Sequence, residues 1–124
     1  MALTFRTRQR EADKVIILDL SGRIVLGDGG KQLSGKIAEL LGEGHNKILL
    51  NLADVTYIDS SGLGEMVGSY GRIAKSGGKI KLLNVPPRIA DLLRMTKMHM
   101  IFECFSEEHA AVSSFEENQT GASA

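Results

Sequence analysis

An acidic residue, two hydroxyls and a glycine stand together at residues 59–62, which read Asp-Ser-Ser-Gly. They follow the apolar run ILLNLADVTYI and precede a segment whose apolar residues recur at spacings of three and four. This order predicts a strand that gives way to a helix at Asp59. A serine in such a place either caps the helix or is displayed for chemistry, because loops after parallel strands are where such folds present reactive groups.

A structural cap explains only part of this motif. Asp59 or Ser60 would accept a hydrogen bond from the first turn of the helix, and Gly62 would let the backbone turn closely. A cap does not require two hydroxyls beside a carboxylate. We therefore favour a hydroxyl that is presented for modification.

A phosphate on Ser60 would affect a partner far more than the domain itself. The helix start stabilises a negative charge by about 0.3–1 kcal/mol. A partner docked over the junction would have to bury about 1.5 to 2 negative charges, at a cost of several kcal/mol. A penalty of about 4 kcal/mol lowers affinity roughly a thousandfold. One serine can therefore switch binding without unfolding the domain.

A catalytic serine is the rival interpretation. The sequence lacks the G-x-S-x-G elbow of serine hydrolases, and the spacing of His45, His99 and His109 does not pair any of them with Ser60. The GDGG stretch at residues 27–30 is not a P-loop, because no Gly-Lys-Ser/Thr follows in register. No two His, Cys or Asp residues fall at a ligand-like spacing. We expect no enzyme activity, no metal and no cofactor.

The motif needs a frame of strands and helices, and these alternate from residue 15 onward. Strands are predicted at residues 15–20, 47–52, 79–85 and 100–105, with an edge strand at 3–8, a turn at 11–13 and a loop at 23–30. Helices are predicted over residues 33–41, 62–76, 87–93 and, after a capping Ser106, over 107–117. This pattern is typical of βα units. We expect one α/β domain, a mostly parallel (mixed) sheet of four or five strands with about four helices.

Length and composition narrow the class of protein. A chain of 124 residues suggests one domain, expected at residues 1–117, with a small polar tail at 118–124 expected to be disordered. Fifteen basic side chains balance fifteen acidic ones and there is no Trp. Direct nucleic-acid binding is therefore disfavoured, since it needs a basic face.

The expected location is the cytoplasm. No apolar stretch approaches the roughly 20 residues of a membrane span, and the first residues lack the apolar core of a signal peptide. The single cysteine, Cys104, lies in the run MIFECF. It is expected to be a buried strand thiol in a reducing compartment.

At the central motif the chain resembles a known family. LNLADVTYIDSSGLGEMVGSYGRIAKSGGKIKLLNV, residues 50–85, resembles the centre of a STAS domain, specifically that of the bacterial anti-sigma factor antagonists. The Asp-Ser-Ser-Gly-Leu-Gly core, the following helix and the Gly-Gly before the next strand all match. PPRIADLLRMTKMHMIFECFSEEHAAVSSF resembles the end of the same domain. The resemblance covers about residues 3–117.

The resemblance implies a regulatory binding protein in bacterial transcription. In the family, the unphosphorylated antagonist binds an anti-sigma factor that is also a serine kinase, and this partner switching frees a sigma factor. The kinase inactivates the antagonist by phosphorylating the serine directly after the Asp, which is Ser60 here, and a PP2C-type phosphatase reverses this. The implied docking surface comprises Asp59, Ser60, Ser61, Gly62, Leu63 and Gly64.

One departure from the family pattern leaves the choice of kinase open. The family commonly carries Gly-x-Leu/Ile-Asp after the second strand, but here Val25 follows Ile24. Either Asp28 supplies the acidic group from a shifted position and belongs to the partner surface, or that contact is missing. The alternative function is a STAS scaffold without a switch, or a subunit of a signalling or lipid-transport complex.

Overall fold

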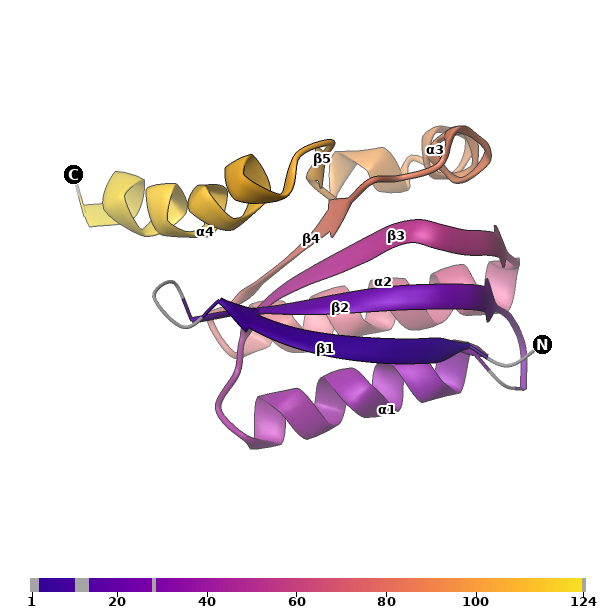
Figure 1. The fold of residues 1–124 in the computed structure, drawn as a ribbon, viewed down its shortest axis with the longest axis horizontal. Coiled ribbons are helices and arrows are strands. Elements are labelled where there is room, and N and C mark those ends of the chain that lie inside the picture. Colours follow the sequence, from indigo (N-terminus) through magenta and orange to yellow (C-terminus); the bar gives the residue numbers. More distant parts are fainter. Residues whose placement is uncertain (1–2, 11–13, 28, 124) are drawn as a thin grey trace.

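The computed structural model describes residues 3–10, 14–27 and 29–123, and side chains as far as residue 116. Within these ranges the chain forms five strands, four α-helices and one 3-10 helix (Figure 1). Their order is β1 (Thr4–Arg10), β2 (Val15–Ile24), α1 (Gly29–Gly42), β3 (Lys47–Ile58), α2 (Ser60–Lys75), β4 (Lys79–Leu83), α3 (Pro87–Met95), η1 (Met98–Met100), β5 (Cys104–Phe105) and α4 (Glu108–Ser123). The predicted turn at 11–13 lies outside the described residues.

The strands form one mixed sheet in the order β1-β2-β3-β4-β5. β1 is an antiparallel edge strand, and the other neighbours pair in parallel. The predicted α/β class and the edge position of the first strand are confirmed. Among the described residues, no helix is both long enough and apolar enough to cross a membrane.

Helices cover both faces of the sheet, so the central strands are apolar on both sides. The larger core cluster joins β2 and β3, through residues such as Leu18 and Leu50, to Leu33 of α1 and Met66 of α2. A smaller cluster on the opposite face places α4 over the sheet (Figure 1). Its members are Val15, Ile17, Leu49, Leu83, Ala111, Val112 and Phe115.

β2 and β3 are longer than predicted. The predicted end at Ser21-Gly22 was wrong, because β2 continues to Ile24. β3 continues past the buried pattern at 47–52 to Ile58 and gives way to α2 at Asp59, the boundary predicted from the motif. Register shifts between Asp19 and Ser21 and between Gly22 and Arg23 mark bulges in β2. A bulge lets a strand continue past a glycine that otherwise reads as a stop.

The predicted strand at 100–105 was largely wrong. Only Cys104 and Phe105 pair with β4, and Met98–Met100 form a 3-10 helix. The apolar pattern instead reflects Phe102, which is 1% exposed and packs into the larger cluster. Cys104 does lie in a strand, but it is exposed and not the buried thiol that was expected.

The start of α4 also differs from the prediction. Glu107, not Ser106, caps the helix, because its carboxylate accepts from the backbone N–H groups of His109 (2.7 Å) and Ala110 (3.0 Å). The helix is assigned as far as Ser123. The domain boundary at residue 117 and the disordered tail at 118–124 stay predictions.

A buried lysine fastens α4 to the sheet. Lys81 of β4 is 1% exposed, and its Nζ donates to the Ser114 hydroxyl of α4 at 2.8 Å. The same ammonium lies 3.2 Å from the Glu103 carboxylate and 4.8 Å from the centre of the Phe115 ring. A buried charge needs such partners, because its desolvation is costly.

Arg8 joins three elements in a second polar contact with α4. Its guanidinium donates to both oxygens of Asp19 in β2, at 2.6 and 2.9 Å, and to both oxygens of Glu108 in α4, at 2.8 and 3.1 Å. These bonds lower the pKa of Asp19 and of Glu108. A carboxyl whose pKa is lower in the folded state contributes stability above its unfolded pKa, and this is lost as the pH falls through the folded pKa.

We predict that Arg8→Met lowers the free energy of unfolding by about 1–3 kcal/mol at pH 7, since it removes several charge-assisted hydrogen bonds. The variant should also lose less stability than the wild type between pH 6 and pH 3. Urea unfolding followed by circular dichroism measures both. Arg6→Met, on the same strand, is the matched control, because no side-chain hydrogen bond or ion pair involves Arg6 within the described chain, and its charge is only the last of the causes that lower the pKa of Asp19. Equal acid sensitivity of wild type and Arg8→Met would contradict this role.

Candidate functional site at the start of α2

Asp59 connects the start of α2 to the loop between β2 and α1. It is the N-cap of the helix, and its Oδ1 accepts from the Gly62 N–H at 2.7 Å. Its Oδ2 accepts from the Leu26 N–H at 3.0 Å, and its own N–H donates to the Ile24 carbonyl at 3.2 Å. The predicted cap is therefore present, and the same carboxylate also fixes the neighbouring loop.

The surroundings of Asp59 favour its charged form. The Gly62 N–H lowers the pKa of Asp59 most, followed by the Leu26 N–H, with smaller contributions from the Ser61 N–H and the charge of Arg23. This contact therefore stabilises the fold above the unfolded pKa of the carboxyl, and the stabilisation is lost as the pH falls through the lower folded value. The junction keeps its negative charge at neutral pH.

The two serines differ in accessibility. Ser60 is the first residue of α2 and is exposed, while Ser61 is half-buried. Within the described chain, neither hydroxyl has a hydrogen-bond partner. The Ser60 hydroxyl is therefore open to a modifying enzyme, on a backbone that the Asp59 cap holds in place.

Two glycines allow the ends of three elements to meet here. A Cβ on Gly62 would lie 2.0 Å from the Ile24 carbonyl oxygen, and one on Gly29 would lie 2.1 Å from the Arg23 carbonyl oxygen. Both distances are far below van der Waals contact, so no side chain fits. Part of the predicted loop at 23–30 is therefore strand and helix start: β2 ends at Ile24 and α1 begins at Gly29.

The predicted docking residues fall into exposed and buried groups. Ser60 and Gly64 are exposed, and Asp59 and Ser61 are half-buried, so these four can meet a partner. Gly62 and Leu63 are buried and instead support the junction from below. Asp28 lies outside the described residues.

Sequence reasoning missed the apolar surface beside Ser60. Leu26 is 74% exposed and Tyr57 is 43% exposed, and the guanidinium of Arg23 lies 5.2 Å from the centre of the Tyr57 ring. Leu26 is hydrogen-bonded through its backbone to Asp59, so its side chain is held close to the junction. A leucine within a glycine-rich loop was the available signal for it. Tyr57 had none, because its run of residues reads as ordinary strand.

A serine–histidine pair for catalysis is not formed by the described residues. No hydrogen bond joins Ser60 to any histidine. His45 precedes β3 and Ser60 follows it. A strand of that length, at about 3.3 Å per residue, puts tens of ångströms between its ends.

Comparison with known proteins decides the family. The STAS domain family model matches residues 6–111. This chain belongs to the STAS domain family. The STAS assignment made from the central motif is thereby confirmed.

Individual relatives agree with the STAS assignment. The chain is 30% identical to the anti-sigma-B factor antagonist of Bacillus subtilis (strain 168), over 90% of this chain and 99% of that protein. It is 33% identical to the anti-sigma F factor antagonist of Paenibacillus polymyxa, over 56% of this chain and 59% of that one. The structure of unphosphorylated SpoIIAA, an anti-sigma factor antagonist, superposes with a TM-score of 0.68 at 20% identity, over 90% and 96% of the two chains. At that identity the likeness shows the shared fold.

We predict opposite effects for two alanine substitutions in the first turns of α2. Gly62→Ala should lower the free energy of unfolding by at least about 1–3 kcal/mol, because the new Cβ would overlap the Ile24 carbonyl. Gly64→Ala should raise it by about 0.5–1 kcal/mol, since its surroundings are open and alanine favours a helix. Urea unfolding of both variants measures the difference. A Gly62→Ala variant as stable as Gly64→Ala would refute the close approach of β2 and α2.

Proposed function

We propose that this STAS domain is an anti-sigma factor antagonist that binds its anti-sigma factor through the start of α2. The observation that carries the proposal is the exposed Ser60 hydroxyl at a capped helix start, beside the exposed side chain of Leu26. The names of the relatives support the same function. We call this surface the α2 junction, formed by Leu26, Tyr57, Asp59, Ser60, Ser61 and Gly64.

The α2 junction combines the properties of a small interface centre. Leu26 and Tyr57 offer apolar area that a partner can cover. Tyrosine is among the residues that contribute most of the affinity of protein interfaces. Where a Cβ of Gly64 would stand, no atom from outside its own helical turn lies within 4 Å, so a partner's backbone can approach α2 closely there.

Phosphorylation of Ser60 would end binding through charge. The phosphate would sit beside the ionised Asp59, whose two oxygens already hold the N–H groups of Gly62 and Leu26. A docked partner would then cover a phosphate in place of the neutral hydroxyl, next to the anion already present at Asp59, and burying unpaired charge costs several kcal/mol. The fold itself would remain, because Ser60 is exposed and makes no side-chain hydrogen bond within the described residues.

The remaining parts of the proposal concern the partners. The anti-sigma factor is proposed to be a serine kinase that phosphorylates Ser60 with its own ATP, and a PP2C-type phosphatase restores the hydroxyl. The chain is then a substrate and binding partner in the bacterial cytoplasm, with no catalysis, cofactor or direct nucleic-acid contact of its own. Asp28 is proposed as a further contact from the loop beside Leu26.

Substitutions of Ser60 test the switch. Ser60→Ala should bind the anti-sigma factor in the presence of kinase activity and ATP, because it cannot accept phosphate. Ser60→Asp should bind at least about 100-fold more weakly, corresponding to about 2.7 kcal/mol. Isothermal titration with the purified anti-sigma factor measures both, and mass spectrometry after incubation with ATP locates the phosphate.

Ser106→Asp is the matched control, since it adds the same charge at an exposed serine outside the α2 junction. It should leave binding unchanged. The proposed phosphorylation switch would be refuted if Ser60→Asp bound as tightly as the wild type and Ser60 stayed unmodified after incubation with ATP. If the domain were then found in a signalling or lipid-transport complex, that result would favour the alternative function, a scaffold or subunit without a switch.

A further inference from the structure

The short fourth strand leaves one corner of the sheet open. The last residue pair between β3 and β4 is Asn51 with Leu83, although β3 runs on to Ile58. β4 stops because Asn84 adopts a left-handed backbone with φ of 56°, and the two prolines that follow have no N–H to donate. β5 adds only two pairs to β4. The missing corner is where the chain turns into α3.

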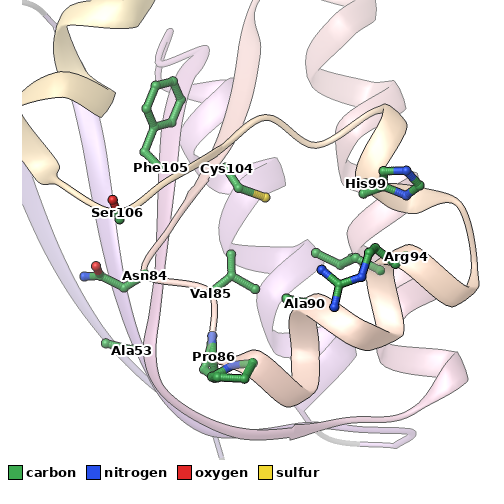
Figure 2. A pocket seen from close by; sticks show the side chains of 12 residues that line it. Ala53, Asn84, Val85, Pro86, Ala90, Arg94, His99, Cys104, Phe105 and Ser106 are labelled. Atoms are coloured by element: carbon green, nitrogen blue, oxygen red, sulfur yellow. The ribbon is translucent and has the colours of Figure 1, made fainter.

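A cavity of about 870 Å³ fills this corner, between α3 and β5 (Figure 2). Its walls are largely apolar and include Val85, Pro86, Ala90, Leu93 and Phe105. The volume lies within the roughly 300–1,000 Å³ of small-molecule sites, which are also mostly apolar with a few polar groups. None of the lining residues belongs to the α2 junction. The cavity is therefore separate from the proposed partner surface.

The cavity is lined by one cationic side chain and by no acidic one. Arg94 carries that charge, His99 also lines the cavity, and none of the twelve lining residues is acidic. Figure 2 shows Arg94 and His99 on one side of the cavity and Ser106 on the other, with Cys104 between them. Within the described residues, neither the His99 ring nor the Ser106 hydroxyl has a hydrogen-bond partner. Donors for an anion are therefore available on both sides.

Arg94 has one ion-pair partner, Asp91, one turn earlier on the outer side of α3. The two side chains are 62% and 63% exposed. Exposed pairs of this kind contribute little free energy, so an anion in the cavity can compete for the guanidinium. Asp91 is not among the lining residues.

From these observations we propose that the cavity between α3 and β5 binds a small amphipathic anion. Its apolar body would lie on Pro86, Ala90, Leu93 and Phe105. Its carboxylate, sulfonate or phosphate group would bind Arg94, with His99 beside it. This binding site is additional to the antagonist function, and the proposal does not depend on that function.

The experiment uses the full chain and the fluorescent anion 8-anilinonaphthalene-1-sulfonate. It should bind with one-to-one stoichiometry and a fluorescence increase. Octanoate should displace it, whereas octylamine, with a similar chain and the opposite charge, should not. Displacement by both to the same extent, or no saturable binding up to millimolar probe, would overturn the proposal.

Two variants of α3 localise the site. Arg94→Gln should weaken binding of the probe about tenfold, the loss of about 1.4 kcal/mol that a charge-assisted contact would bring. Arg88→Gln removes the same charge from an exposed position of α3 outside the cavity, and should bind as the wild type does. If Arg94→Gln and Arg88→Gln bound the probe with equal affinity, the probe would bind outside this cavity and the proposal would be wrong. Thermal unfolding checks that both fold.

The only cysteine of the chain offers a second readout that does not depend on the probe. Cys104 lines the cavity, so saturating octanoate should slow its modification by a disulfide reagent several-fold. Partial burial of the sulfur and the charge of Glu103 raise the pKa of Cys104, and the labelling is therefore run at alkaline pH. An unchanged rate of modification would contradict binding in this cavity.

Discussion

The carboxylate of Asp59 holds together two segments that lie 33 residues apart in the chain. One oxygen binds the first turn of α2 and the other binds the loop after β2. Gly62 and Gly29 let the backbones come close enough for this contact. The position of Ser60 follows from it, because the residue stands directly after Asp59 on a helix start that cannot shift freely. An exposed hydroxyl thus sits on a rigid base, with Leu26 held nearby.

Much of the fold could be predicted because its signals are local. Apolar runs such as Val15–Leu20 predict strands that are covered on both faces, and the helical spacing after Ser61 predicts α2. The strand ends could not be predicted in the same way. Gly22 reads as a stop, yet pairing with β3 carries β2 through a bulge there. The apolar run before Phe105 likewise reads as a strand, although tertiary packing draws Phe102 into the core.

The residues of the candidate site also differ in whether a local sequence signal reveals them. Asp59 and Ser60 could be identified because a carboxylate followed by two hydroxyls at a strand–helix boundary is more than a cap needs. Tyr57 could not, since the exposure of a strand residue depends on what packs against that part of the sheet, and its local sequence does not show this. The cavity between α3 and β5 was equally hidden. It arises because β3 runs on beside β2 after its last pair with β4, and that extra length depends on pairing between strands that no local pattern shows.

Because the core consists of two separate clusters, α4 can detach from the sheet without disrupting the larger cluster. α4 rests on the small cluster and on Lys81, while β2, β3, α1 and α2 share the large one. If α4 lifts away, the ammonium of Lys81 regains water, which offsets part of the lost apolar contact. Opening of this helix alone therefore costs less than global unfolding. Its backbone amides should exchange with deuterium well before those of the central strands.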